Sequence, residues 1–243
     1  MLILVGCSRE PVVPKPFIVE PGVGIPGIVE LGMTVDQVRG LVRGETVEYY
    51  PKIRYPWQVA DYDYEDPHFF QARASHTRTP TEKPTDVQVQ IPHLGLVFYT
   101  KSDTDPIRSI TFWSGPNPMP VNSNTWFTGQ LSCGISFEER RRVPRDEVVA
   151  HFGEPTERFD DSDVKTSEDQ RELFFAIDAQ IKQGKAVSKR HSNGVEHLHY
   201  PTNGIMFILR DDKVLTFTIK EKVEQDESTV PVKAAPSASS PVR

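Results

Sequence analysis

The chain lacks the features that mark several common protein classes. Its 243 residues include two cysteines, Cys7 and Cys133, which are too few for a disulfide framework. It has no run of 18 or more apolar residues, so the sequence predicts no transmembrane helix. The formal net charge is -6, whereas a protein that binds nucleic acid usually presents a basic face. The sequence therefore argues against a disulfide scaffold, a membrane-spanning protein and a nucleic-acid-binding protein.

The common sequence signatures of catalysis are missing as well. The chain contains no P-loop, no Gly-x-Ser-x-Gly nucleophile motif and no dinucleotide-binding fingerprint. Nothing in it indicates a small-molecule substrate or a cofactor. Its hydrophobic content of 37% is still sufficient for a packed core. We therefore expect a folded protein that is not an enzyme.

The opening residues resemble the lipobox of bacterial lipoproteins, in the run Leu4-Val5-Gly6-Cys7. The resemblance implies cleavage before Cys7 and a diacylglycerol on its thiol, which would hold the protein at a membrane surface. The basic head of a signal peptide is missing, which indicates a start codon further upstream. Ser8 implies, by the same resemblance, outer-membrane sorting, so we expect an outer-membrane lipoprotein of the cell envelope that faces the periplasm or the surface. A chance tetrapeptide on a soluble protein is the alternative.

Composition divides the rest of the chain. Five prolines and two glycines lie between residues 9 and 26, which is typical of a stiff, extended tether. The C-terminal residues are rich in Pro, Ser and Ala and are expected to be disordered. The predicted organisation is a truncated lipoprotein signal (1–7), a Pro-rich tether (8–27), a first helix-plus-sheet unit (28–116), a second helix-plus-sheet unit (117–222) and a disordered tail (223–243).

Two stretches of the chain share a Pro-x-x-Gly-x-x-Phe pattern followed by a charged turn and an alternating apolar segment. The matched pairs are Pro92 with Pro201, Gly95 with Gly204, Leu96 with Ile205, and Phe98 with Phe207. Each stretch predicts a β-hairpin, with the glycine at a bend or bulge before its first strand.

A short helix is predicted upstream of each hairpin. In the first, Thr34 and Gln37 form a capping box. In the second, Pro144 suits a helix start, and Gly153 followed by Pro155 ends it. The distance from helix to hairpin is nearly equal in the two copies. The sequence thus predicts an α+β fold of two tandem repeats, each a short helical segment packed on an antiparallel sheet.

The first helix resembles the helix motif of small outer-membrane lipoproteins of the SmpA/OmlA (BamE) type. The matching residues are Gly32, Met33, Thr34, Asp36, Gln37 and Val38. The second copy also resembles the C-terminal half of pyocin-S-type immunity proteins. The residues that match there are Gly129, Leu131, Gly134, Ile135, Phe137, Val148, Phe152, Gly153 and Pro155. The tandem β-lactamase inhibitor protein has a comparable two-unit plan. These resemblances imply a protein-binding scaffold.

Three histidines are the candidate metal ligands. His197 and His199 share one face of a predicted strand, and His191 precedes them. Such a set could bind zinc in a metal-dependent hydrolase. We favour the alternative that the three histidines lie on the solvated face, because Leu198 and Tyr200 take the core-facing side, and we expect no metal. Cys133 is expected to be a buried, inert thiol.

An acidic segment rich in aromatic residues supplies the candidate partner surface. Its candidate residues are Trp57, Tyr62, Tyr64, Phe69 and Phe70. Aromatic side chains dominate the binding energy of protein interfaces, although these five could equally belong to the core. The leading hypothesis is a lipid-anchored cell-envelope protein that acts as a non-enzymatic protein-binding or assembly module. The alternative is a soluble inhibitor or immunity-like protein that binds one specific target.

Overall fold

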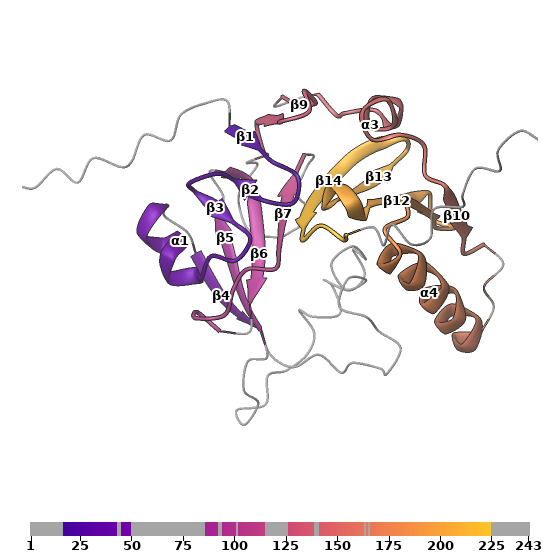
Figure 1. Cartoon of the computed structure of the whole chain (residues 1–243), viewed down its shortest axis with the longest axis horizontal. Coiled ribbons are helices and arrows are strands. Elements are labelled where there is room, and N and C mark those ends of the chain that lie inside the picture. Colours follow the sequence, from indigo (N-terminus) through magenta and orange to yellow (C-terminus); the bar gives the residue numbers. More distant parts are fainter. Residues whose placement is uncertain are drawn as a thin grey trace, which may run out of the picture.

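The computed structural model describes residues 17–42, 45–49, 86–91, 94–100, 102–114, 126–138, 141–162, 164 and 166–224. This part of the chain has a mixed α+β fold with three α-helices and mostly antiparallel strands (Figure 1). The helices are α1 (Val35–Leu41), α3 (Arg145–Phe152) and α4 (Ser167–Lys182). The expected α+β class is therefore confirmed.

Nine strands form the main sheet of the described residues. Their order is β10-β11-β12-β13-β14-β7-β6-β5-β4, and every neighbouring pair is antiparallel except β10 and β11. The first half contributes β4 (Glu45–Tyr49), β5 (Asp86–Ile91), β6 (Leu96–Thr100) and β7 (Ser109–Trp113). The second half contributes β10 (Glu157–Asp160), β11 (Val187–Arg190), β12 (Val195–Tyr200), β13 (Ile205–Arg210) and β14 (Lys213–Lys220).

The two halves meet edge to edge where β7 pairs with β14. Thr111 lies opposite Thr218 in this pair, and their hydroxyl oxygens are 3.0 Å apart in a hydrogen bond. The edge strand of each half is thereby covered by the other half, which removes two unpaired sheet edges. The halves therefore share one continuous sheet.

Strand registers are alike in the two halves. Ile91 pairs with Leu96 in the first half, and Tyr200 pairs with Ile205 in the second. The hairpins themselves pair in the same way. Phe98 lies opposite Ile110, and Phe207 lies opposite Phe217. The two hairpins that the sequence predicts are therefore present. Gly95 and Gly204, the glycines before them, have φ values of +62° and +69°, as a bend requires.

Each short helix begins next to the turn of the hairpin in its own half. The N–H of Val35 in α1 donates to the carbonyl of Asp103, and the N–H of Arg145 in α3 donates to the carbonyl of Asp212. The capping box of Thr34 and Gln37 is present, and α3 ends at Gly153, so both predicted helices are confirmed.

The Pro-rich stretch does not remain extended to residue 27 as expected. From Phe17 onward it joins the folded body through β1 (Phe17–Val19) and β2 (Gly24–Ile25). Strand β1 pairs in parallel with β8 (Gly129–Leu131), which also pairs with β9 (Ser136–Phe137), and β2 pairs with β3 (Val29–Glu30). The physical reason is that Phe17, Val19 and Ile25 bury apolar side chains, while Pro21 and Pro26 occupy turns.

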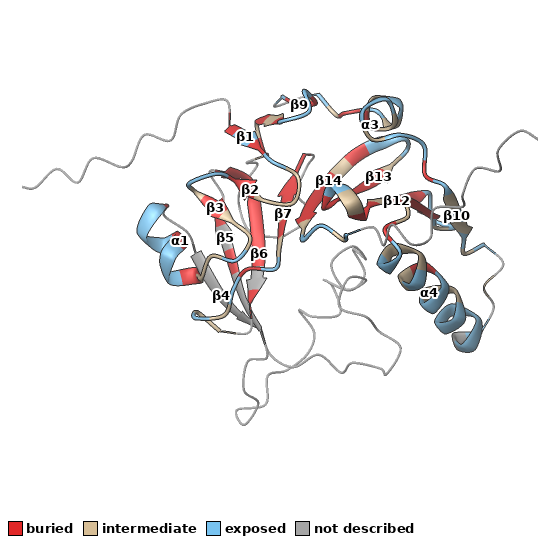
Figure 2. Cartoon of the chain, viewed as in Figure 1, coloured by how far each residue is buried: buried red, intermediate tan, exposed pale blue. Residues whose placement is uncertain are grey.

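One apolar core runs across the joint between the halves (Figure 2). Phe112 of β7 stacks on Phe217 of β14 with ring centroids 4.7 Å apart and an interplanar angle of 5°. Val38 of α1 and Val148 of α3 belong to the same cluster. Burial of this shared apolar surface, at about 25 cal/mol per Å², is the main force that holds the halves together.

Helix α4 was not expected from the sequence. It follows β10 and leads into β11, so the parallel β10–β11 pair has the helical crossover that parallel strands need. Thr166 and Asp169 form a complete capping box at its start. In this helix the side chain of Ile177 is buried, whereas Phe175 is 56% exposed.

Candidate functional site

The main predicted sites lie outside the described residues. These are the lipidation candidate Cys7 and the aromatic residues Trp57, Tyr62, Tyr64, Phe69 and Phe70. Cys133 is described, and it is exposed rather than buried. It lies in the turn between β8 and β9, where no apolar layer covers it, so the prediction of a buried thiol is wrong.

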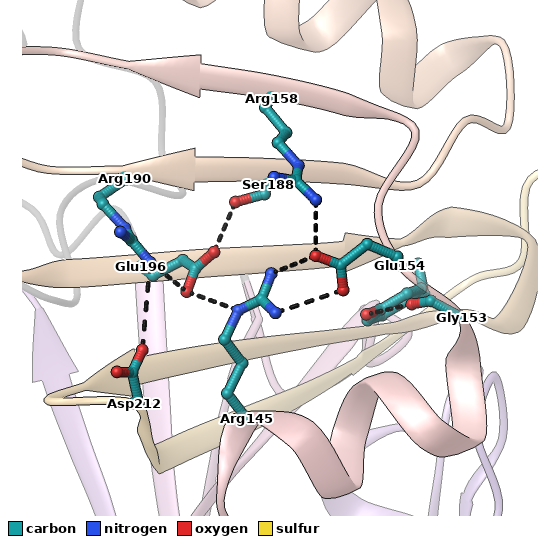
Figure 3. A network of polar contacts seen from close by, with 9 residues as sticks. Arg145, Gly153, Glu154, Arg158, Ser188, Arg190, Glu196 and Asp212 are labelled. Atoms are coloured by element: carbon teal, nitrogen blue, oxygen red, sulfur yellow. Dashed lines mark hydrogen bonds and ion pairs between the residues drawn. The ribbon is translucent and has the colours of Figure 1, made fainter.

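Arg145, the first residue of α3, is the centre of a polar network that the sequence did not reveal (Figure 3). Both its terminal nitrogens donate to the carboxylate of Glu154, at 3.2 and 3.1 Å. Its Nε donates to Glu196 Oε2 at 3.0 Å. Such a bidentate ion pair fixes the plane of the guanidinium group and is stronger than a single hydrogen bond. Arg145 therefore joins α3 to the sheet and to the segment that follows the helix.

Glu196 of β12 is the buried member of the network, with a side chain 6% exposed. Its Oε1 accepts a hydrogen bond from the Ser188 hydroxyl at 2.7 Å, and its Oε2 accepts from Arg145 and, at 3.4 Å, from Arg190. Burial acts to raise the pKa of Glu196, but the hydrogen bonds from Ser188 and Arg145 and the charges of Arg145 and Arg190 outweigh it and lower the pKa. Glu196 is therefore held as a carboxylate.

Strand registers explain this arrangement. Arg190 of β11 pairs with Glu196 of β12, and Ser188 lies two residues earlier on the same face. Arg158 of β10 pairs with Ser188 and donates to Glu154 at 2.7 Å. Three neighbouring strands thus project polar side chains toward the start of α3.

A cleft of about 530 Å³ opens beside the network. Its lining includes three guanidinium groups, those of Arg145, Arg158 and Arg190. The carboxylates that line it are Asp146, Glu154, Asp160, Glu196 and Asp212. The five carboxylates outnumber the three guanidinium groups by two. It therefore favours a cationic group over an anion.

Replacing Glu196 with glutamine is expected to lower the free energy of unfolding by about 2 kcal/mol. The amide keeps the size of the side chain but removes the charge that compensates Arg145 and Arg190. Urea unfolding measures the change. Glu157→Gln is the matched control because Glu157 pairs with Lys185 near the surface, where an ion pair contributes below about 1 kcal/mol. Equal losses in the two variants would contradict the role given to Glu196.

The candidate metal ligands are not on a solvated face. His197 is 6% exposed, because α4 covers the side of β11 and β12 that faces away from the core. Its ring centroid lies 4.7 Å from that of His191 and 6.2 Å from that of His199. His191 Nδ1 lies 2.6 Å from Asp161 Oδ2. The structure therefore corrects the expected exposure of the histidines.

The histidines are brought together without forming a metal site. Within the described ranges, no group of three His, Cys, Asp or Glu side chains is arranged to hold a metal ion.

In the same part of the chain, no helix has both the length and the apolar character needed to cross a membrane.

Stability is expected to fall as the pH drops from 7.5 to 5.5. Burial, together with the charges of His197 and Lys189, outweighs Asp161 and lowers the pKa of His191 to about 4. Burial and the charges of His197, Lys220 and Lys189 hold the pKa of His199 well below its usual value. Above pH 6.5 both imidazoles are neutral in the folded and unfolded chains, so their contribution is fully present. Below pH 6.5 the unfolded chain binds protons first, and the contribution is lost as the pH approaches 4.

Urea unfolding at several pH values tests this expectation. Each histidine contributes a slope of at most about 1.4 kcal/mol per pH unit. Comparison of the unaltered chain with a His191→Gln variant isolates the contribution of that histidine. His191→Gln is expected to reduce the slope. An unfolding free energy that stays constant from pH 7.5 to 5.5 would show that the histidines are not buried in neutral form.

Comparison of the chain with protein-family models, with curated proteins and with solved structures finds no match. The resemblances to envelope lipoproteins and immunity proteins therefore stay predictions from short motifs.

Proposed function

We propose that this chain is a lipid-anchored, non-enzymatic binding module of the bacterial cell envelope, made of two copies of one unit. The second copy carries the binding site for a protein partner that presents a lysine or arginine side chain. The observation that carries the proposal is the cleft of about 530 Å³ with its fixed Arg145–Glu196 network.

Equivalent contacts in the two halves support the duplication. The N–H of Ile107 donates to the carbonyl of Met33 in the first half, and the N–H of Val214 donates to the carbonyl of Val143 in the second. With the repeat aligned on its hairpins, Thr111 corresponds to Thr218, and these two residues lie opposite each other in the β7–β14 pair. A pseudo-twofold axis through this pair accounts for both the registers and the joint.

Divergence of the copies points to the second one as the specialised unit. The first residue of α1 is the buried, apolar Val35, whereas α3 begins with Arg145, which lines the cleft. Among the residues that the structure describes, β10 and α4 belong to the second half. A shared scaffold with one polar cleft suits recognition of a specific partner, and the surplus of carboxylates in the cleft suits a basic one.

The lipobox-like residues support the location. Nine residues (8–16) separate Cys7 from β1, and acylation of its thiol would hold the folded body close to a membrane surface. A surface anchor restricts the partner to the cell envelope. The alternative function, a soluble inhibitor of one target, would not need Cys7.

Mass spectrometry of the N-terminal peptide tests the location. The gene is expressed in a Gram-negative host, the cells are fractionated, and a Cys7→Ala variant serves as control. The proposal predicts a diacylated Cys7 in the membrane fraction and a soluble Cys7→Ala protein. An unmodified Cys7 in the soluble fraction would reject the anchor and leave the soluble inhibitor as the better account.

A further inference from the structure

Strand β10 (Glu157–Asp160) forms one end of the nine-stranded sheet and lies at the right of Figure 1. Among the residues that the structure describes, β11 is the one strand that pairs with it. Its charged residues Arg158 and Asp160 are exposed. A strand at the end of a sheet presents backbone groups to which a further strand can pair, so the outer edge of β10 is a candidate docking surface.

The hydrogen bonds to β11 show which residues of β10 turn their backbone groups outward. Glu157 donates its N–H to the carbonyl of Ala186, and Asp161 donates its N–H to the carbonyl at the end of β11. Successive residues of a strand turn their backbone groups to opposite sides. Arg158 and Asp160 therefore direct their N–H and C=O groups away from β11, toward any strand that adds to this edge.

A second copy of β10 fits this edge when the two strands run antiparallel about a twofold axis beside Phe159. Arg158 of each chain then lies opposite Asp160 of the other. Both residues direct their backbone groups outward, so each such pair exchanges two main-chain hydrogen bonds. Their side chains lie on the same face of the joined sheet and carry opposite charges, which stabilises a cross-strand pair.

Other registers of this pairing are unfavourable. A shift by one residue places an outward-facing residue opposite an inward-facing one, so the ladder of hydrogen bonds cannot form. A shift by two residues places Arg158 opposite Arg158, or Asp160 opposite Asp160, and like charges directly opposite each other are destabilising. The charges of β10 therefore select one register, and its twofold symmetry closes the assembly at two chains.

The surroundings of β10 are compatible with this register. Arg158 donates to Glu154 at 2.7 Å, but its side chain is 66% exposed and can contact a second carboxylate. Asp160 accepts a hydrogen bond from the N–H of Ser162 at 2.8 Å, and a carboxylate can accept several more. Phe159 is half-buried on the opposite face, where it would lie beside its counterpart as an aromatic cross-strand pair.

Two carboxylates also meet in this register, because Glu157 of one chain lies opposite Asp161 of the other. Each has a partner within its own chain. Glu157 is paired with Lys185 at 3.1 Å, and Asp161 accepts a hydrogen bond from the N–H of Ser192 at 2.8 Å. The ammonium group of Lys185 offsets the repulsion between the two carboxylates.

We propose that the chain forms a weak homodimer through β10, in which two sheets join edge to edge. Arg158 and Asp160 also line the Arg145 cleft, so the dimer presents two such clefts on one face of the joined sheet. Strand β4, at the other end of the sheet, contains two glutamates and no basic residue, so it lacks this self-complementary charge pattern. The inference goes beyond the proposed binding function and does not depend on it.

Sedimentation velocity of the full chain tests the proposal. The Cys7→Ala form is used in a reducing buffer, which prevents disulfide dimers through the exposed Cys133. Two short strands make a small interface, so we expect a monomer–dimer equilibrium between about 10 µM and about 500 µM. Amide exchange at Arg158 and Asp160 should slow as the dimer forms. A monomer over the whole range, or an open series of larger species, would overturn the proposal.

Charge variants locate the interface. Arg158→Asp places carboxylates opposite each other and Asp160→Arg places guanidinium groups opposite each other, so each variant alone should dimerise at least tenfold more weakly. An equimolar mixture of the two should form a heterodimer, because each position again meets an opposite charge. Arg108→Asp is the matched control, since Arg108 is exposed and lies in the first half, and it should dimerise as the unaltered chain does. Circular dichroism checks the folding of each variant.

Failure of the mixture to associate, or unchanged dimerisation of either single variant, would contradict the pairing of Arg158 with Asp160. These measurements contain no other protein. Their failure would therefore leave the proposed envelope partner untouched, and absence of that partner would leave the dimer standing.

Discussion

Gly204→Ala is expected to lower the free energy of unfolding by about 3–4 kcal/mol. A Cβ at this position would lie 2.5 Å from the carbonyl oxygen of Lys220 and 2.6 Å from the Cα of Gly22. Both neighbours are backbone atoms, so neither can rotate away. The φ of +69° adds strain for any residue with a side chain. The loss is large because Gly22, in the N-terminal segment of the first half, packs against this turn of the second half.

The Gly27→Ala variant separates the steric overlap of the new Cβ from the conformational strain of a positive φ. Gly27 has a similar φ of +73°, but nothing lies within 4 Å of its would-be Cβ. It should therefore show the conformational cost alone, about 1 kcal/mol. Urea unfolding of both variants gives the difference. If Gly204→Ala cost no more than Gly27→Ala, the close approach of Gly22 to Gly204 would be refuted.

Phe217→Ala is expected to lower the free energy of unfolding by about 3–5 kcal/mol and to destabilise both halves together. Phe217 has no exposed surface. Its ring stacks on Phe112 from the first half and on Phe137, each with a centroid distance of 4.7 Å. Removing it opens a cavity in the core that the halves share. Trp113 lies in β7 of the first half, so its fluorescence reports on that half when Trp57 and Trp126 are replaced by phenylalanine, and hydrogen exchange of β12 and β13 reports on the second.

Phe175→Ala is the matched control, because it makes the same chemical change on the exposed side of α4. It should lower the free energy of unfolding by less than about 1 kcal/mol. Coincident unfolding curves by the two probes are expected for the unaltered chain and for both variants. Separate transitions, with Phe217→Ala affecting β12 and β13 alone, would show that the halves are independent domains.

The sequence predicted those elements whose signals are local. The Thr34–Gln37 capping box, the helix stop at Gly153 and the glycines before the hairpins each act over a few residues. Helix α4 had comparable local signals, since Thr166 and Asp169 cap it and Phe174, Ile177 and Ile181 recur at helical spacing. Acidic residues surround its start, and a segment of that composition is more typical of a solvated turn than of a helix that packs on a sheet.

Features that depend on distant pairings could not be predicted. Nothing local to Thr111 or Thr218 indicates that their strands join. The sheet face with His197 is polar in sequence, which suggested solvent, and its burial follows from where α4 lies. Tertiary context, rather than alternation, decides whether such a face is covered.

The candidate site was missed for the same reason. Glu196 lies 51 residues from Arg145 in the sequence, although Glu154 lies only nine residues from it. One signal was available, because Glu196 lies two residues before the core residue Leu198 and therefore shares its face. A carboxylate on a core-facing position requires a partner, but the sequence does not identify Arg145 as that partner.

Photo-crosslinking in intact cells tests the binding module most directly. A benzophenone amino acid replaces Asp212 at the rim of the cleft, or Asp103 in the corresponding turn of the first half. The account predicts an adduct from position 212 to one envelope protein, through a segment that contains lysine or arginine. It also predicts no such adduct from position 103 and a loss of at least fivefold when Asp146→Lys and Asp160→Lys reverse the charge of the cleft. Equal adducts from both positions, or an adduct unaffected by charge reversal, would contradict it.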